Sequence, residues 1–97
     1  MHIMTHSWSN FKDKLEKWCK TETNLIGQTY TYKYIPEKEC CVVELNMYNH
    51  FKAKRVITKD NYYQISNKDV NDNSICSLIT QNLKKKYKDR DHLGFNP

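Results

Sequence analysis

The hydrophobic periodicity of this chain changes twice, and the order of these changes constrains the fold more than any other feature. Apolar residues recur at helical spacing in the first segment, Ser7–Lys20, with a stripe of Trp8, Phe11, Leu15, Trp18 and Cys19. Ser7 is the predicted N-cap. Alternating, strand-like patterns follow, and a second helical stripe begins after Asp72-Asn73-Ser74, three candidate N-cap residues. This order predicts an α+β fold.

Four segments of the middle region have strand-like alternation: Ile26–Ile35, Cys40–Tyr48, Phe51–Thr58 and Tyr62–Ser66. Hairpin loops at Pro36–Glu39, Tyr48–His50 and Lys59–Asn61 give a register with one uniformly apolar face, pairing Tyr34 with Cys41, Leu45 with Ala53 and Ile57 with Tyr63. Two-residue loops would instead place Leu45 opposite Lys54 and mix the faces. We therefore predict a two-layer α+β sandwich, a four-stranded antiparallel meander with N- and C-terminal helices on one face (α-β-β-β-β-α).

A chain of 97 residues is long enough for one hydrophobic core. We predict a single small domain over residues 1–97, with flexible ends at about 1–6 and 92–97. The apolar stripes of the helices and the apolar sheet face should meet in its centre. That centre is predicted to contain Trp8, Phe11, Leu15, Trp18, Tyr32, Val43, Leu45, Ile57, Ile75, Ile79 and Leu83.

The net charge of +5 lies entirely in the second half of the chain. Basic and acidic residues balance up to His50, whereas ten Lys and Arg face five acids from Phe51 onward. Such asymmetry suggests an acidic partner, for which nucleic acid is the usual candidate. A solvated lysine surface, stabilised in the last helix by the helix dipole, explains the same residues without a ligand. The predicted nucleic-acid-binding residues are Lys52, Lys54, Arg55, Lys84, Lys85 and Lys88.

The sheet face away from the helices is predicted to mix polar and apolar side chains. A polar face would simply be solvated, whereas the apolar content favours docking or dimerisation. The predicted partner-binding residues on this face are Lys33, Val42, Glu44, Val56 and Tyr62. The stripe of Tyr30, Tyr32 and Tyr34 has the spacing of a base-stacking platform, but the register assigns it to the core.

We predict no catalytic residue, no metal site and no cofactor. The two glycines exclude a phosphate-binding glycine loop, and the cysteines, Cys19, Cys40, Cys41 and Cys76, form no C-x-x-C pair. Reduced thiols, together with the absence of a signal-peptide pattern or an apolar membrane span, favour a cytoplasmic protein, in the host cytoplasm if the source is viral. The one enzymatic alternative is a small RNase using His50, Lys52, Lys54, Arg55 and Tyr62.

These features favour a non-enzymatic protein that binds nucleic acid or the acidic surface of a nucleoprotein, as a monomer or homodimer and without a membrane. The abundance of Asn, Lys, Tyr and Ile is typical of AT-rich coding sequences. A phage or viral accessory protein that inhibits host machinery is a hypothesis resting on size and composition alone. The alternative function is a protein–protein interaction module that uses the free sheet face without binding nucleic acid.

Overall fold

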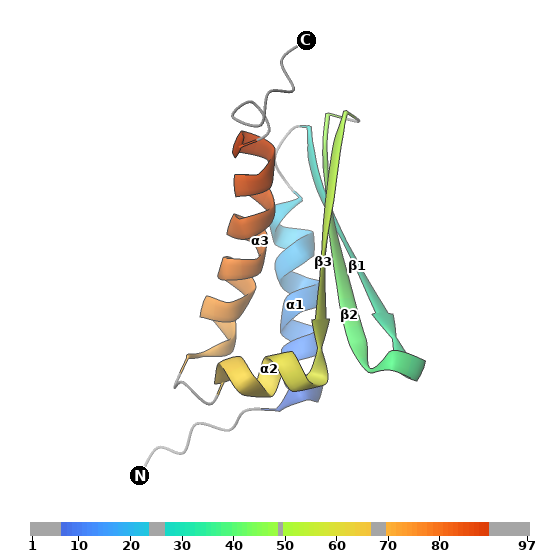
Figure 1. Cartoon of the computed structure of the whole chain (residues 1–97), viewed down its shortest axis with the longest axis vertical. Coiled ribbons are helices and arrows are strands. Elements are labelled where there is room, and N and C mark those ends of the chain that lie inside the picture. Colours follow the sequence, from blue (N-terminus) through green and yellow to red (C-terminus); the bar gives the residue numbers. More distant parts are fainter. Residues whose placement is uncertain (1–6, 24–26, 49, 67–69, 90–97) are drawn as a thin grey trace.

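A computed structural model describes residues 7–23, 27–48, 50–66 and 70–89. The predicted flexible ends, residues 1–6 and 92–97, lie outside these ranges. Helices lie on one side of an antiparallel sheet whose strand order is β1-β2-β3 (Figure 1). In chain order the elements are α1 (Trp8–Glu22), β1 (Gln28–Ile35), the 3-10 turn η1 (Pro36–Lys38), β2 (Cys40–Met47), β3 (Phe51–Thr58), α2 (Lys59–Ser66) and α3 (Asp72–Asp89).

Helix α1 forms where the first apolar stripe predicts it. The Ser7 side chain caps its N-terminus by accepting a hydrogen bond from the Asn10 N–H at 3.3 Å. Phe11, Leu15 and Cys19 are fully buried along the face toward the sheet. At the other end, the Thr23 hydroxyl donates to the Cys19 carbonyl at 2.7 Å and satisfies one of the free carbonyls of the last turn.

The predicted register of the first two hairpins is confirmed. Tyr34 pairs with Cys41, and Leu45 pairs with Ala53. The turn between β1 and β2 contains Glu39 in the left-handed region at φ 45°, which lets four residues join the strands. The helix-facing side of the sheet is therefore apolar in its centre except at Arg55, which pairs with Val43 and is exposed on the edge strand β3.

The predicted fourth strand, Tyr62–Ser66, is wrong: this segment lies in helix α2, and the sheet has three strands among the described residues. A reciprocal cap starts the helix. The Asn61 N–H donates to the Thr58 hydroxyl at 3.0 Å, and the Thr58 N–H donates to the Asn61 side chain. The helical spacing of Tyr62 and Ser66 places both on one face of α2, where both are buried.

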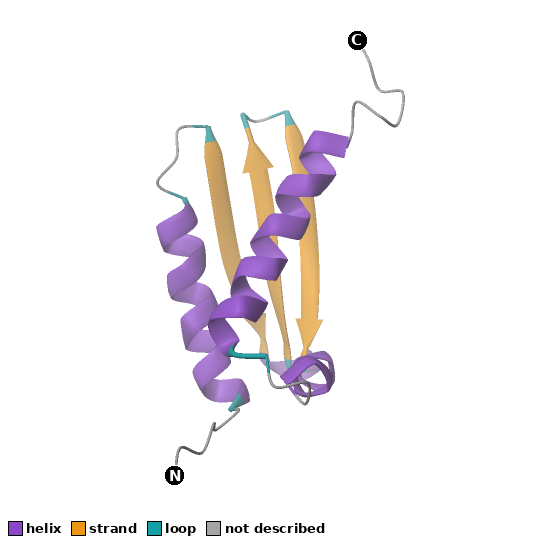
Figure 2. Ribbon diagram, turned by 90° about the vertical axis from the view of Figure 1, so that its left-hand side faces the viewer, coloured by secondary structure: helices purple, strands orange, loops and turns teal. Residues whose placement is uncertain are grey.

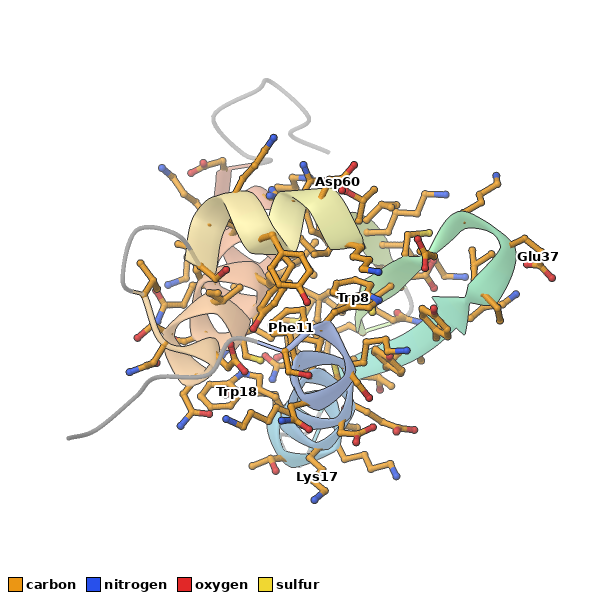
Figure 3. The ribbon with its side chains drawn as sticks, turned by 90° about the horizontal axis from the view of Figure 1, so that it is seen from below. Trp8, Phe11, Lys17, Trp18, Glu37 and Asp60 are labelled. Carbon is orange, nitrogen blue, oxygen red and sulfur yellow. The ribbon has the colours of Figure 1, made fainter. Side chains whose placement is uncertain are left out.

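The core lies between the helices and one face of the sheet. Helix α3 crosses this face diagonally, from beside α1 to the region over β3 (Figure 2). Trp8 and Phe11 project from α1 toward α2, where Phe11 stacks on Tyr62 with 4.5 Å between ring centroids (Figure 3). The predicted core residues are buried except Trp18 and Tyr32, which are partly buried against the same cluster. No helix among the described residues covers the opposite sheet face (Figure 1).

A buried carboxylate fixes the start of α3 against both other helices. Asp72 accepts a hydrogen bond from the Tyr62 hydroxyl at 2.8 Å and lies 3.7 Å from the Lys14 ammonium. The N-cap is Asn71, whose side chain accepts from the Ser74 N–H at 2.7 Å, so the three predicted caps lie inside the helix instead. Asp72 therefore links α1, α2 and α3 and favourably faces the positive end of the helix dipole.

Candidate binding surfaces

Three predicted phosphate-binding lysines surround a hollow on the outer face of α3. The hollow has a volume of about 320 Å³ and is lined by Gln81, Lys84, Lys85 and Lys88, which helical spacing places on one face. Lys84 lies 4.0 Å from Glu22 at the end of α1. Lys85 and Lys88 are exposed, and neither has an ion-pair partner within residues 7–23, 27–48, 50–66 and 70–89. The described lining residues of the hollow thus include three lysines and no acid, although Lys84 has Glu22 as a neighbour.

The predicted lysines of β3 lie on the other side of the molecule. Lys52 and Lys54 pair with Asn46 and Glu44 on the uncovered sheet face, and both are exposed. Arg55 pairs with Val43 and therefore lies on the helix-facing side of β3. The six predicted residues therefore do not form one surface. Lys52 and Lys54 lie on the uncovered side of the sheet, and the three lysines of α3 lie on the helix side. Arg55 is also on the helix side, apart from its sequence neighbours.

Four of the five predicted partner-binding residues share the uncovered face. Lys33, Val42 and Val56 form one row across the three strands, and Glu44 stands in the next row. Val56 is 44% exposed. The fifth residue, Tyr62, was placed wrongly, because α2 turns it into the core, where it is fully buried.

The proposed RNase constellation does not come together. Tyr62 points into the core and donates its hydroxyl to Asp72, and Lys54 and Arg55 lie on opposite faces of β3. Burial, with the hydrogen bond to Asp72 as a second cause, raises the pKa of the Tyr62 hydroxyl, which disfavours its release of a proton.

The tyrosines of β1 pack in or against the core, as the register predicts. Tyr30 is buried and donates its hydroxyl to the Thr80 carbonyl at 3.1 Å. The Lys12 ammonium lies 3.8 Å from the centre of the Tyr34 ring and covers that ring. A stack of bases would therefore meet helix α1 and not a free aromatic surface.

All four cysteines fall in the described part of the chain, and each has a buried, free thiol. Burial raises the pKa of both Cys19 and Cys76 to about 12, so neither forms a reactive thiolate near neutral pH. Cys40 and Cys41 pair across different rows and face opposite sides of the sheet. In the described ranges, no three His, Cys, Asp or Glu side chains are grouped to hold a metal ion.

The sequence pattern does not predict a second hollow, which has a volume of about 320 Å³. Residues of α1 and the start of α3 line it: Lys14, Lys17, Trp18, Thr21, Glu22 and Asn73. Trp18 lies on the side of α1 toward α3 and donates its indole N–H to Thr80, while Lys17 projects away from the molecule (Figure 3). The one sequence signal for this hollow is the position of Trp18 at the margin of its apolar stripe. The contribution of Asn73 cannot be predicted locally, because Asn73 is distant in sequence from α1.

Comparison of the chain with protein-family models, curated proteins and solved structures finds no match. Any functional proposal therefore rests on the residues of the chain itself. Among the helices described, none has the length and apolar content that crossing a membrane requires.

Proposed function

We propose that this protein is a non-enzymatic binding protein that docks on an acidic macromolecule, with nucleic acid as the first candidate. The supporting observation is the hollow on α3, where Lys84, Lys85 and Lys88 converge without an acid among the lining residues. Phosphates carry the charge that such lysines attract, and their neutralisation releases counterions that drive association. Gln81, held by a 2.8 Å hydrogen bond to the Ser77 hydroxyl, supplies a polar contact at the rim.

Lysines alone position a phosphate backbone but do not read a base sequence. The bidentate geometry by which Arg recognises guanine is not available in the hollow, whose cations are all lysines. Binding with weak sequence preference follows. The basic surface of β3 lies on the opposite side of the sheet, so it contributes to overall attraction and not to the same contact.

The test compares two double variants that lower the net charge equally. Lys85→Glu/Lys88→Glu changes the hollow, and Lys20→Glu/Lys38→Glu changes exposed lysines elsewhere in the described chain, also near helix ends. Fluorescence anisotropy with labelled DNA and RNA at low salt measures affinity. The first variant should bind much more weakly than the second. Equal losses would reduce the interaction to general attraction, and no binding by the parent protein would remove nucleic acid as the ligand.

Docking of a protein on the uncovered sheet face is the second candidate. Its support is the apolar end of that face, where Ile35, Val42 and Val56 occupy adjacent rows and Val56 is 44% exposed. Val56→Arg should abolish capture of a protein partner. Ser9→Arg is the matched control, because it adds the same charge at an exposed position of α1 away from these rows.

A further inference from the structure

The two edges of the sheet differ in how their backbone groups are satisfied. On β1, the Thr23 hydroxyl covers the outer edge at Tyr30: it accepts a hydrogen bond from the Tyr30 N–H at 2.9 Å, and its single proton is shared between the Cys19 carbonyl at 2.7 Å and the Tyr30 carbonyl at 3.1 Å. An incoming strand would have to displace these bonds. Thr23 thus protects the β1 edge at Tyr30.

The geometry of Tyr30 also fixes which groups of β3 face outward. Since Tyr30 directs its N–H and carbonyl away from β2, the Tyr30–Leu45 pair is non-hydrogen-bonded. Leu45 must then bond to Ala53 on its other side, and alternation turns the backbone groups of Lys52, Lys54 and Val56 away from β2.

This outward edge of β3 is open from Lys52 to Val56. At its end, the Thr58 N–H is taken by the Asn61 side chain at 3.4 Å. Within the parts of the chain that the structure describes, no group bonds to the outer backbone of the three preceding outward-facing residues. Three consecutive outward N–H and carbonyl pairs are enough to template a short added strand.

The charges on β3 determine which kind of strand can pair with its open edge. Lys52, Lys54 and Arg55 are exposed and flank the open edge on both faces. A second copy of β3 would bring six cations together, so these residues oppose edge-to-edge self-association. A strand that carries acids opposite the cations gains cross-strand attraction. An apolar residue opposite Val56 would extend the apolar row of the uncovered face.

We propose that the β3 edge, Lys52–Val56, binds an extended acidic segment of a partner protein as an added antiparallel strand. Main-chain hydrogen bonds hold the segment, and its alternate side chains meet Lys52 and Lys54 on one face and Arg55 on the other. This inference does not depend on nucleic-acid binding by α3, because the two surfaces share no residue.

The probe is a labelled, capped peptide, Thr-Val-Glu-Glu-Val-Glu-Thr, whose glutamates fall opposite Arg55, Lys54 and Lys52 in antiparallel pairing. Lys54→Pro removes the outward N–H and obstructs pairing, and an outward position on an edge strand tolerates proline. Lys54→Val is its matched control, since both variants lose the same charge. Thermal melting confirms that each variant is folded, and fluorescence anisotropy measures peptide affinity.

The parent protein should bind the peptide, and Lys54→Pro should bind it about tenfold more weakly than Lys54→Val. The same peptide with every amide N-methylated keeps its charge and should lose binding to the parent protein. This second comparison decides the question even if Lys54→Pro does not fold. Equal binding of the N-methylated peptide, or no binding of the parent peptide, would overturn the proposal.

Discussion

Removing the Tyr62 hydroxyl tests the helical placement of Lys59–Ser66 most sharply. Tyr62→Phe keeps the fully buried ring stacked on Phe11 and leaves Asp72, only 6% exposed, with Lys14 at 3.7 Å as its remaining charged partner. Loss of a hydrogen bond to a carboxylate costs about 1.5–3 kcal/mol. We expect a loss of about 2 kcal/mol in the free energy of unfolding, equivalent to a fall of about 8–16 °C in Tm for a domain of this size.

Urea denaturation followed by circular dichroism measures the loss. Tyr48→Phe is the matched control, because Tyr48 is 53% exposed and its variant should change stability by no more than about 0.5 kcal/mol. In a double-mutant cycle, Tyr62→Phe and Asp72→Asn should show a coupling energy of about 0.5–3 kcal/mol. A neutral Tyr62→Phe, or additive effects of the two substitutions, would refute the buried Tyr62–Asp72 contact.

Three further predictions concern the sheet, the edge cap and the thiols. Leu45→Asp should prevent folding because it buries an unpaired charge, whereas exposed Lys52→Asp should leave Tm nearly unchanged; equal damage would contradict the register. Thr23→Val should lower stability by about 1–3 kcal/mol in urea melts, since it leaves the Tyr30 backbone unbonded, and a neutral result would show that this cap is dispensable. Folding raises the pKa of the Cys19 and Cys76 thiols, so the free energy of unfolding should be retained below pH ~9 and should decrease as the pH rises toward about 12. Replacing both cysteines with alanine should make this decrease shallower by about 1.4 kcal/mol per pH unit for each thiol. An unchanged slope would contradict the raised pKa of the two thiols.

Local pattern is sufficient to predict α1, the first two hairpins and most of the core. The alternation of β2 places Val43 and Leu45 on one face, and the observed loop lengths keep the centre of that face apolar across the sheet except at Arg55. Register is thus determined by side-chain chemistry within a few residues. The same logic predicts the Ser7 cap, because its partner is three residues away.

Segment Lys59–Ser66 shows where such logic fails. Tyr62 and Ile65 have the side chains of a strand, and Asn61 suits a hairpin turn. The competing signal, Thr58 three residues before Asn61, is a capping pattern that the sequence already contains. Long-range contacts decide between them, since Tyr62 reaches Phe11 and Asp72 only from a helix.

The arrangement of the candidate basic residues does not follow from the sequence. Charge counting locates the lysines of β3 and α3, yet strand parity separates Arg55 from Lys54 and the tertiary fold puts α3 on the other side of the sheet. The outward direction of the backbone groups of Lys52, Lys54 and Val56 follows from the alternation of hydrogen-bonded pairs across the sheet, which the periodicity of a single strand does not encode.

The salt dependence of DNA binding tests the proposed docking function most directly. Each phosphate contact contributes about 0.9 to the slope of log K against log salt for duplex DNA, so Lys85→Gln/Lys88→Gln should make the slope shallower by about two contacts' worth, roughly 1.8. Lys20→Gln/Lys38→Gln removes the same charge from exposed positions outside the hollow and should leave the slope nearly unchanged. Identical slopes for the two variants would contradict a phosphate-binding role for the α3 hollow.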